Sequence, residues 1–399
     1  MSSTAAPRLL ALGGLIAMAV AVGIGRFVYT PILPPMAQGL GLTTGEAGLI
    51  ASANFAGYLA GAVAAAWARG LGHPRAWLVG ALAVSAVTTG LMAWVDGLAA
   101  ALVWRFAGGA ASAYVLVLAS ALVLERLAAT GHAALSAVHF SGVGTGIACS
   151  ALLTWGLAAA GFGWREMWLG SGALSIAGLI AVMALVPAAA PAASRVNGAA
   201  APPPTAADGG RLRLVTVAYG LFGFGYVITA TFIVLIVRGS PEATAIEPVF
   251  WLAVGLAAVP SVALWVAWGR RMGTMPAFAV ACLVEALGVL ASVAWPGVAG
   301  LLAAAILLGG TFMGLTALGL IAARDLAPTD ARRWVGILTS AFGLGQIIGP
   351  VVAGYGFDLT GSFFLPSMLA VAALCVAAVL ALASRRQNDV RRRFGVGLQ

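Results

Sequence analysis

Apolar stretches of roughly 20 residues recur from one end of this 399-residue chain to the other. A helix of that length crosses the ~30 Å hydrocarbon core of a bilayer. The intervals between the stretches are too short for a soluble domain, and 62% of the residues are hydrophobic whereas only 8% are charged. The chain is therefore predicted to be an all-α integral membrane protein. The first stretch, from Leu9, is expected to be retained, because it is too long for a signal peptide.

Charges and turn residues between these stretches divide the chain into twelve predicted transmembrane helices. Their approximate ranges are 9–35, 45–68, 76–95, 98–124, 134–160, 164–187, 212–237, 247–269, 275–295, 298–322, 333–356 and 363–384. An even number of helices places both termini on the same side of the membrane.

The arginines indicate which side that is. Only Arg165 and Arg238 fall in the predicted outer loops, and Arg26 and Arg105 lie within helices, whereas the other arginines fall on the side of the termini. Because basic residues concentrate in cytoplasmic segments, both termini are predicted to be cytoplasmic. We interpret the net charge of +9 as this orientation signal beside anionic lipid, and expect no nucleic-acid binding.

A segment rich in alanine, proline and glycine separates the sixth and seventh predicted helices. Its composition is typical of a linker and cannot form a packed core. We therefore predict an N-terminal six-helix bundle over residues 1–187, a cytoplasmic linker over 188–211, and a C-terminal six-helix bundle with a short basic tail over 212–399.

Features of the first half recur in the second at an offset of about 200 residues. The matching pairs are Gly23 with Gly223, Glu46 with Glu247, Arg69 with Arg270, Gly108-Gly109 with Gly309-Gly310, and Gly142 with Gly343. Since each half has six helices, matching helices share one orientation, which predicts a parallel pseudo-two-fold repeat. Such a repeat places a cavity between the halves and suits alternating access, in which the halves rock about a central site.

Several segments resemble the major facilitator superfamily, and more narrowly its YbfB/YjiJ group of bacterial members. They are "GIGRFVYTPILPPM", "HFSGVGTGI", "YGLFGFGYVITATF" and "GGTFMGLTALGL", and "RFAGGAASA" resembles the arginine-glycine motif of helix 4 in this superfamily. The resemblance covers the whole chain. It implies a monomeric secondary transporter in the bacterial inner membrane.

Arg105 is expected near the middle of the bilayer. It follows Asp96, the last charge of the outer loop, by nine residues, which is about 14 Å along a helix. An intramembrane charge is costly, so it suggests a functional site. The resemblance implies that helix 4 lines the cavity, which favours contact with substrate or a coupling proton. The alternative is an arginine bound to backbone carbonyls at a broken helix or to a neighbouring helix.

Arg26 lies ~26 Å along the first helix from Leu9, and it either faces the cavity or snorkels outward. Thr30 lies on the same helix face, and Tyr226 is the repeat mate of Arg26 on the seventh helix. Two arginines in one half would form a positive site suited to a carboxylate or similar anion.

Two further residues are candidates for carrying a coupling proton. His139 lies inside an apolar run, and an imidazole changes charge near neutral pH. Glu285 lies near mid-depth on the ninth helix, where a carboxyl group is expected to be protonated or paired. For both residues the alternative is a role in helix packing.

Polar side chains at helical spacing are candidates for lining the cavity. They are Asn54 with Tyr58 on the second helix and Tyr219 with Tyr226 on the seventh. The alternative is hydrogen bonding between helices.

Several classes of function are disfavoured by what the sequence lacks. The three cysteines are far apart without metal-ligand spacing, and no nucleotide-binding or hydrolase motif occurs, so we expect no metal, no cofactor and no enzymatic activity. The leading hypothesis is a secondary transporter that moves a small organic solute, possibly an anion, and is driven by protons. The alternatives are efflux of apolar drug-like compounds and, from a different class, a membrane-embedded sensor or enzyme.

Overall fold

The computed structural model describes residues 5–67, 73–187, 209–328 and 330–393. Most of the predicted linker, 188–208, and the end of the predicted basic tail, 394–399, lie outside the described residues. The proposed boundaries of the two domains therefore stay predictions.

Twelve helices in the described ranges are long and apolar enough to span a membrane, as the hydropathy pattern predicts. The first span combines α1 (Ala5–Met18), the π-helix η1 (Ala19–Ile24) and α2 (Tyr29–Leu40). The other spans are α3 (Thr44–Trp67), α4 (Pro74–Leu91) with η3 (Met92–Trp94), α5 (Leu98–Ala129), α6 (Ser136–Ala159), preceded by η4 (Ala133–Leu135), α7 (Trp164–Leu185), α8 (Gly209–Arg238), α10 (Glu247–Met272), α11 (Thr274–Ala294), α12 (Gly297–Leu326), α13 (Ala331–Thr360) and α14 (Phe364–Arg393). A short helix, α9 (Pro241–Thr244), connects α8 to α10.

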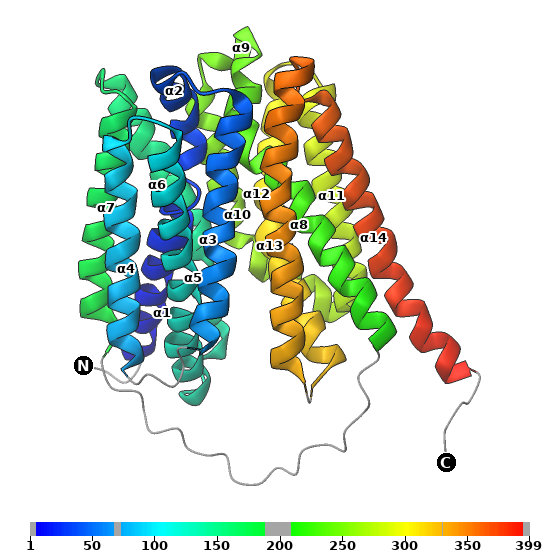
Figure 1. Ribbon diagram of the computed structural model, residues 1–399. Helices are drawn as coiled ribbons and strands as arrows, with labels where there is room; N and C mark the ends of the chain where they lie inside the picture. The colour runs from blue at the N-terminus through cyan, green and yellow to red at the C-terminus, as the bar shows by residue number, and fades with distance from the viewer. Residues whose placement is uncertain (1–4, 68–72, 188–208, 329, 394–399) are drawn as a thin grey trace.

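The spans form two six-helix bundles, one from each half of the chain (Figure 1). Between the bundles, α3 packs against α13 and α6 packs against α10. The repeat relates the α3–α13 contact to the α10–α6 contact, because α3 corresponds to α10 and α13 corresponds to α6. The contacts confirm the predicted parallel pseudo-two-fold arrangement.

Glycines of the repeat bring helices into backbone contact inside each bundle. A Cβ atom on Gly109 of α5 would lie 1.9 Å from the carbonyl oxygen of Asn54 on α3. In the other half, a Cβ atom on Gly309 of α12 would lie 2.2 Å from the carbonyl oxygen of Val254 on α10. The sequence comparison paired Gly109 with Gly310 instead, but no neighbour lies within 4 Å of a Cβ atom there. On this helix the structural pairing is therefore shifted by one residue.

The first span is broken at residues 25–28, which form a turn. The N–H group of Gly25 donates to the oxygen of Val20, five residues back, whereas that of Thr30 donates to the oxygen of Phe27, only three back. The N–H groups of Arg26 and Val28 keep four-residue bonds to Val22 and Ile24, but no backbone N–H group of the described chain donates to the carbonyls of Gly25 and Arg26. The sequence predicted one continuous helix over 9–35, and the break is a difference from that prediction.

The two ends of the bundles differ in how the halves meet. Both termini lie at one end, which we call the terminal face, and the α2–α3 junction lies at the other, the opposite face (Figure 1). At the opposite face the carboxylate of Asp358 on α13 accepts hydrogen bonds from the N–H groups of Thr44 (3.0 Å) and Gly45 (2.8 Å). About 12 Å further along α3, the hydroxyl of Ser52 donates to the carbonyl of Ile347 on α13 (2.7 Å). The halves are thus held together at this face.

Candidate functional site

Arg105 fills the gap that the helix break creates. Its Nη1 donates to the carbonyl oxygen of Gly25 and its Nη2 to that of Arg26, both at 2.8 Å. The guanidinium also lies over the rings of Tyr29 (5.1 Å) and Trp168 (5.8 Å). The side chain is 4% exposed. This is the geometry of the alternative considered above, an arginine bound to backbone carbonyls at a broken helix.

Asn54 secures the helix that carries Arg105. Its side-chain N–H donates to the carbonyl oxygen of Arg105 at 2.8 Å, and the residue is 1% exposed. This bond between α3 and α5 agrees with the alternative of interhelical hydrogen bonding. Asn54 and Arg105 together form a rigid support behind the break.

Arg26 projects from the break into an aromatic enclosure. Its guanidinium carbon lies 4.1 Å from the ring centre of Tyr58, 5.0 Å from that of Phe55 and 5.6 Å from that of Phe27. The side chain is 7% exposed, so it lies inside the protein and does not reach for the membrane surface. The ion pairs found in the described ranges, Arg165–Asp96, Arg238–Glu247 and Arg333–Asp330, do not include it.

Gln346 of α13 joins Arg26 to the other half of the molecule. Nη2 of Arg26 donates to Oε1 of Gln346 at 3.4 Å, and Nε2 of Gln346 donates to the hydroxyl of Tyr226 on α8. The Tyr226 ring is parallel to that of Phe342, with an angle of 2° and centres 5.8 Å apart. We call these residues the Arg26 cluster: Arg26, Phe55, Tyr58, Tyr226, Phe342 and Gln346.

Within the cluster, the structure brings together three residues that the sequence singled out: Arg26, Tyr58 and Tyr226. Sequence reasoning missed Gln346, although a lone amide inside the apolar stretch of the eleventh span marks it as a candidate by the same argument. Phe55 and Phe342 carried no such signal, because phenylalanine is common in apolar helices.

Two other candidate cavity residues serve contacts elsewhere. The hydroxyl of Thr30 donates to the carbonyl of Ala230 on α8 at 2.9 Å, which joins the two halves. The hydroxyl of Tyr219 donates to the carbonyl of Thr316 on α12 at 3.1 Å, and its ring stacks on Phe342 with centres 5.0 Å apart. Tyr219 therefore packs beside the cluster inside the C-terminal bundle.

His139 lies far from Arg26. Its Nε2 is 3.2 Å from the hydroxyl oxygen of Ser120 on α5, a residue about 22 Å further along that helix than Arg105. A Cβ atom on Gly14 would lie 2.5 Å from the Nδ1 atom, so α1 packs directly on the imidazole. The residue is fully buried and joins α1, α5 and α6 inside the N-terminal bundle.

Glu285 is fully buried on α11 in the other bundle. Neither of its carboxyl oxygens has a hydrogen-bond partner by geometry in the described ranges. The hydroxyl of Thr311 is a neighbour, but it donates to the carbonyl of Leu307 at 2.6 Å. Glu285 also lies within electrostatic range of Tyr226, a member of the Arg26 cluster.

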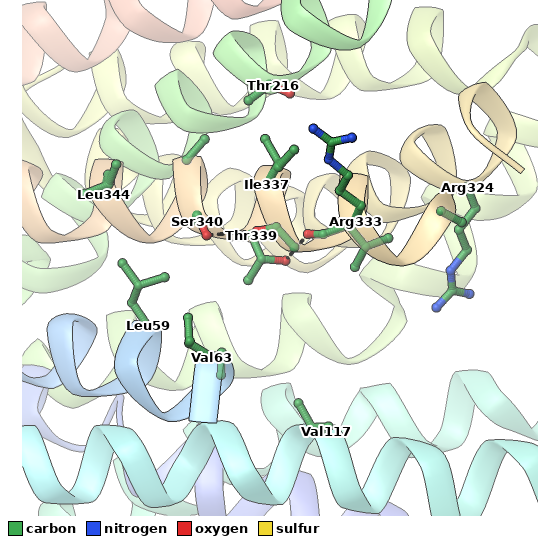
Figure 2. A pocket seen from close by; sticks show the side chains of 15 residues that line it. Leu59, Val63, Val117, Thr216, Arg324, Arg333, Ile337, Thr339, Ser340 and Leu344 are labelled. Atoms are coloured by element: carbon green, nitrogen blue, oxygen red, sulfur yellow. Dashed lines mark hydrogen bonds between the residues drawn. The ribbon is translucent and has the colours of Figure 1, made fainter. Parts of the chain in front are cut away.

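A cavity of about 820 Å³ opens between the two halves on the side of the terminal face (Figure 2). Its walls are largely aliphatic, with Arg324 and Arg333 near the ends of α12 and α13 at the terminal face. The lining includes Leu59 and Leu344, and Leu59 directly follows Tyr58, which covers Arg26. The cavity therefore ends at residues that are next in sequence to the Arg26 cluster, whose own members are not among its lining residues.

Within the described ranges, no group of three or more His, Cys, Asp or Glu side chains could hold a metal ion. The polar groups that converge at the centre are instead a guanidinium, two phenols and an amide. These groups are suited to binding an organic molecule through hydrogen bonds and ring contacts.

Comparisons with known proteins agree with the fold and the two-bundle geometry. The sequence profile of a family described as "uncharacterised MFS-type transporter YbfB" matches residues 18–382. Two crystal structures of the nucleoside transporter NupG are similar at 15% identity. The structure of its D323A mutant has a TM-score of 0.70 and covers 94% of this chain and 99% of that one; the other has a TM-score of 0.68, with 97% and 99% covered. At this identity the likeness shows the fold alone, and a search of curated proteins gave no significant match. The chain is a multi-pass membrane protein of the major facilitator superfamily and belongs to the MFS-type transporter family described by YbfB.

Proposed function

We propose that this secondary transporter moves a small organic anion across the bacterial inner membrane by alternating access, coupled to protons. One observation carries the proposal. Arg26 is a buried guanidinium between the two halves, its Nε has no acceptor in the described ranges, and no carboxylate is paired with it. Because burying an unpaired charge is costly, an anion that enters the site gains a strong charge-assisted interaction.

The contacts between the halves support alternating access with the cavity open to one side. The bonds from Asp358 to the start of α3 close the opposite face, whereas the cavity opens at the terminal face. With cytoplasmic termini, as the arginine distribution predicts, this arrangement corresponds to an inward-open state. Transport then requires the bonds at the opposite face to break while the cavity closes.

Glu285 is our proposed proton site, in preference to His139. It is a buried carboxyl group that interacts electrostatically with Tyr226, which Gln346 joins to Arg26, so loss of its proton would add a negative charge that acts on the same site. His139 has no such connection, since its contacts belong to the packing of α1, α5 and α6.

The experiment is uptake and counterflow in proteoliposomes that contain the purified chain and a panel of labelled organic anions. We expect saturable counterflow of at least one anion, and accumulation of that anion when a pH gradient is imposed. In Arg26→Gln, which keeps polarity but removes the charge, we expect counterflow to fall at least tenfold. Arg8→Gln changes an exposed arginine outside the site and serves as the matched control. Equal counterflow in Arg26→Gln, or transport of cationic or neutral apolar compounds alone, would contradict the proposal and favour efflux of apolar compounds.

A further inference from the structure

The cationic side chains buried in the membrane differ in what they already bind. Arg105 donates to two carbonyl oxygens at the helix break, and Arg126 donates to the carbonyl of Pro187 near the terminal face. Arg26 donates a long bond of 3.4 Å to Gln346 and lies against the Tyr58 side chain, while its Nε has no acceptor in the described ranges. At the centre of the described chain, one guanidinium is thus available for a ligand, and it can neutralise one negative charge.

The surroundings of that guanidinium are aromatic. Ring faces of Phe55 and Tyr58 flank it on the N-terminal half, and the parallel rings of Tyr226 and Phe342 lie on the C-terminal half. The hydrogen-bonding groups beside it are the two phenols and the Gln346 amide. A ligand that displaces the Gln346 bond meets one charged group and several flat apolar surfaces.

Groups that would recognise other anions are engaged or distant. A dicarboxylate or phosphate dianion needs a second cation, but Arg105 is bound to the backbone. Arg324 and Arg333 line the cavity near the terminal face, away from the Arg26 cluster. A zwitterionic amino acid needs an acceptor for its ammonium group, but Glu285 is fully buried on α11 and is not among the residues that contact the Arg26 guanidinium. The aliphatic walls of the cavity, such as Leu59 and Val63, also suit a ligand with an apolar body.

We propose that the substrate class is aromatic monocarboxylates. The carboxylate forms a bidentate pair with Arg26 in place of the Gln346 bond, and the ring of the substrate stacks among the rings of the Arg26 cluster. This inference rests on the proposed function, and it narrows the anion to a single charge on a flat apolar body.

Equilibrium binding to the purified chain in nanodiscs tests the class, because protonated aromatic acids cross lipid unaided and would confuse uptake measurements. The probes are phenylacetate and four matched compounds: phenylacetamide without the charge, acetate without the ring, phenylmalonate with a second carboxylate, and phenylalanine with an ammonium group. We expect phenylacetate to bind at least about tenfold more tightly than each of the four.

Variants assign the two parts of the ligand to their partners. In Arg26→Gln we expect phenylacetate to lose about tenfold or more in affinity and phenylacetamide to lose less than about twofold. In Phe342→Leu we expect phenylacetate to weaken about fivefold, with little change for acetate. The thermal unfolding midpoint without ligand, compared with Arg8→Gln, shows that each variant is folded. Because the readout is a ratio of two affinities in one protein, a general loss of active protein does not change it.

The outcomes separate this inference from the proposed function. If phenylmalonate, phenylalanine or acetate binds as tightly as phenylacetate, and does so through Arg26, the substrate class is wrong while anion transport stands. If phenylacetamide binds as tightly as phenylacetate, or if Arg26→Gln binds phenylacetate with unchanged affinity, both the substrate class and the proposed anion transport are wrong. Absence of phenylacetate binding to folded protein also overturns the class.

Discussion

Arg105 and Arg26 are the same residue type in the same half of the molecule, yet their surroundings give them different tasks. Arg105 supplies two donors to backbone carbonyls and so maintains the break. Arg26 leaves that break as a side chain with ring faces around it. One arginine is therefore a positioning residue, and the other is the proposed binding residue.

Replacing Arg105 is expected to destabilise the fold. In Arg105→Gln, two buried carbonyls lose their donors, and each unsatisfied group costs about 1–3 kcal/mol. The unfolding midpoint in detergent should fall, and anion affinity should fall with it because Arg26 loses its fixed position. Arg105→Lys keeps the charge but loses the paired donors. Its unfolding midpoint and its anion affinity should therefore lie between those of the wild type and those of Arg105→Gln. A variant with wild-type stability but no anion binding would instead make Arg105 a substrate contact.

Glu285→Gln is expected to separate exchange from proton coupling. Glutamine imitates a protonated carboxyl group that cannot release its proton, so counterflow should persist while accumulation driven by a pH gradient is lost. His139→Gln serves as the comparison and should keep the response to the gradient. Gradient-driven accumulation in Glu285→Gln would exclude this residue as the proton site.

The sequence identified Arg26 and Arg105 as charged residues inside transmembrane helices, but it did not distinguish the role of one from that of the other. Depth along a helix follows from residue counts, because the rise per residue is fixed. What a guanidinium binds at that depth depends on carbonyls freed in another helix, such as those of Gly25 and Arg26. Gln346 belongs to the other half and joins the site only through the packing of α13, which hydropathy does not specify.

At the scale of elements, glycines decide where helices touch. Gly109 and Gly310 are each the second glycine of a Gly-Gly pair in their half of the chain. A Cβ atom at Gly109 would lie 1.9 Å from the Asn54 carbonyl oxygen, whereas a Cβ atom at Gly310 would have no neighbouring atom within 4 Å. Gly109→Ala should therefore push α5 away from α3 and lower the unfolding midpoint. Gly310→Ala should be neutral or stabilise by up to about 1 kcal/mol, since alanine favours helix. Equal effects of the two substitutions on thermal unfolding would refute this difference.

The helices themselves were predictable from sequence, because length and hydropathy determine what can cross a bilayer. The break within the first span was not. It depends on Gly23, where a Cβ atom would lie 2.6 Å from the Cα atom of Gly146 on α6, and on donors from Arg105. Both are tertiary contacts, and the local sequence continues to favour an apolar helix through this region.

At the scale of the whole molecule, Asp358 is expected to set the balance between open states. Its carboxylate accepts two N–H bonds from α3 across the interface. Asp358→Asn removes the charge, and because Asp358 is exposed the loss should be about 1 kcal/mol, which shifts the equilibrium about fivefold towards opening of the opposite face.

Thiol labelling measures that shift. In a background with the native cysteines replaced, a cysteine at Ser52, between α3 and α13, should react faster with an impermeant maleimide when Asp358→Asn is present. A cysteine at Ser340, in the cavity wall, should react more slowly from the terminal face. Unchanged rates at both positions would show that Asp358 does not control opening.

The break in the first span has a mechanical consequence. Before it, α1 packs on α5, α6 and α7 of its own bundle. Beyond it, α2 packs on α8 of the other bundle as well as on α7 and α3 of its own, and Thr30 is bonded to Ala230. A single transmembrane segment thus contacts both bundles, and the turn at residues 25–28 connects its two helical parts. Arg105 holds this turn through its bonds to the carbonyl oxygens of Gly25 and Arg26, and Arg26 is itself a residue of the turn. Any rotation of one bundle against the other would move Arg26, the side chain that we propose binds the substrate.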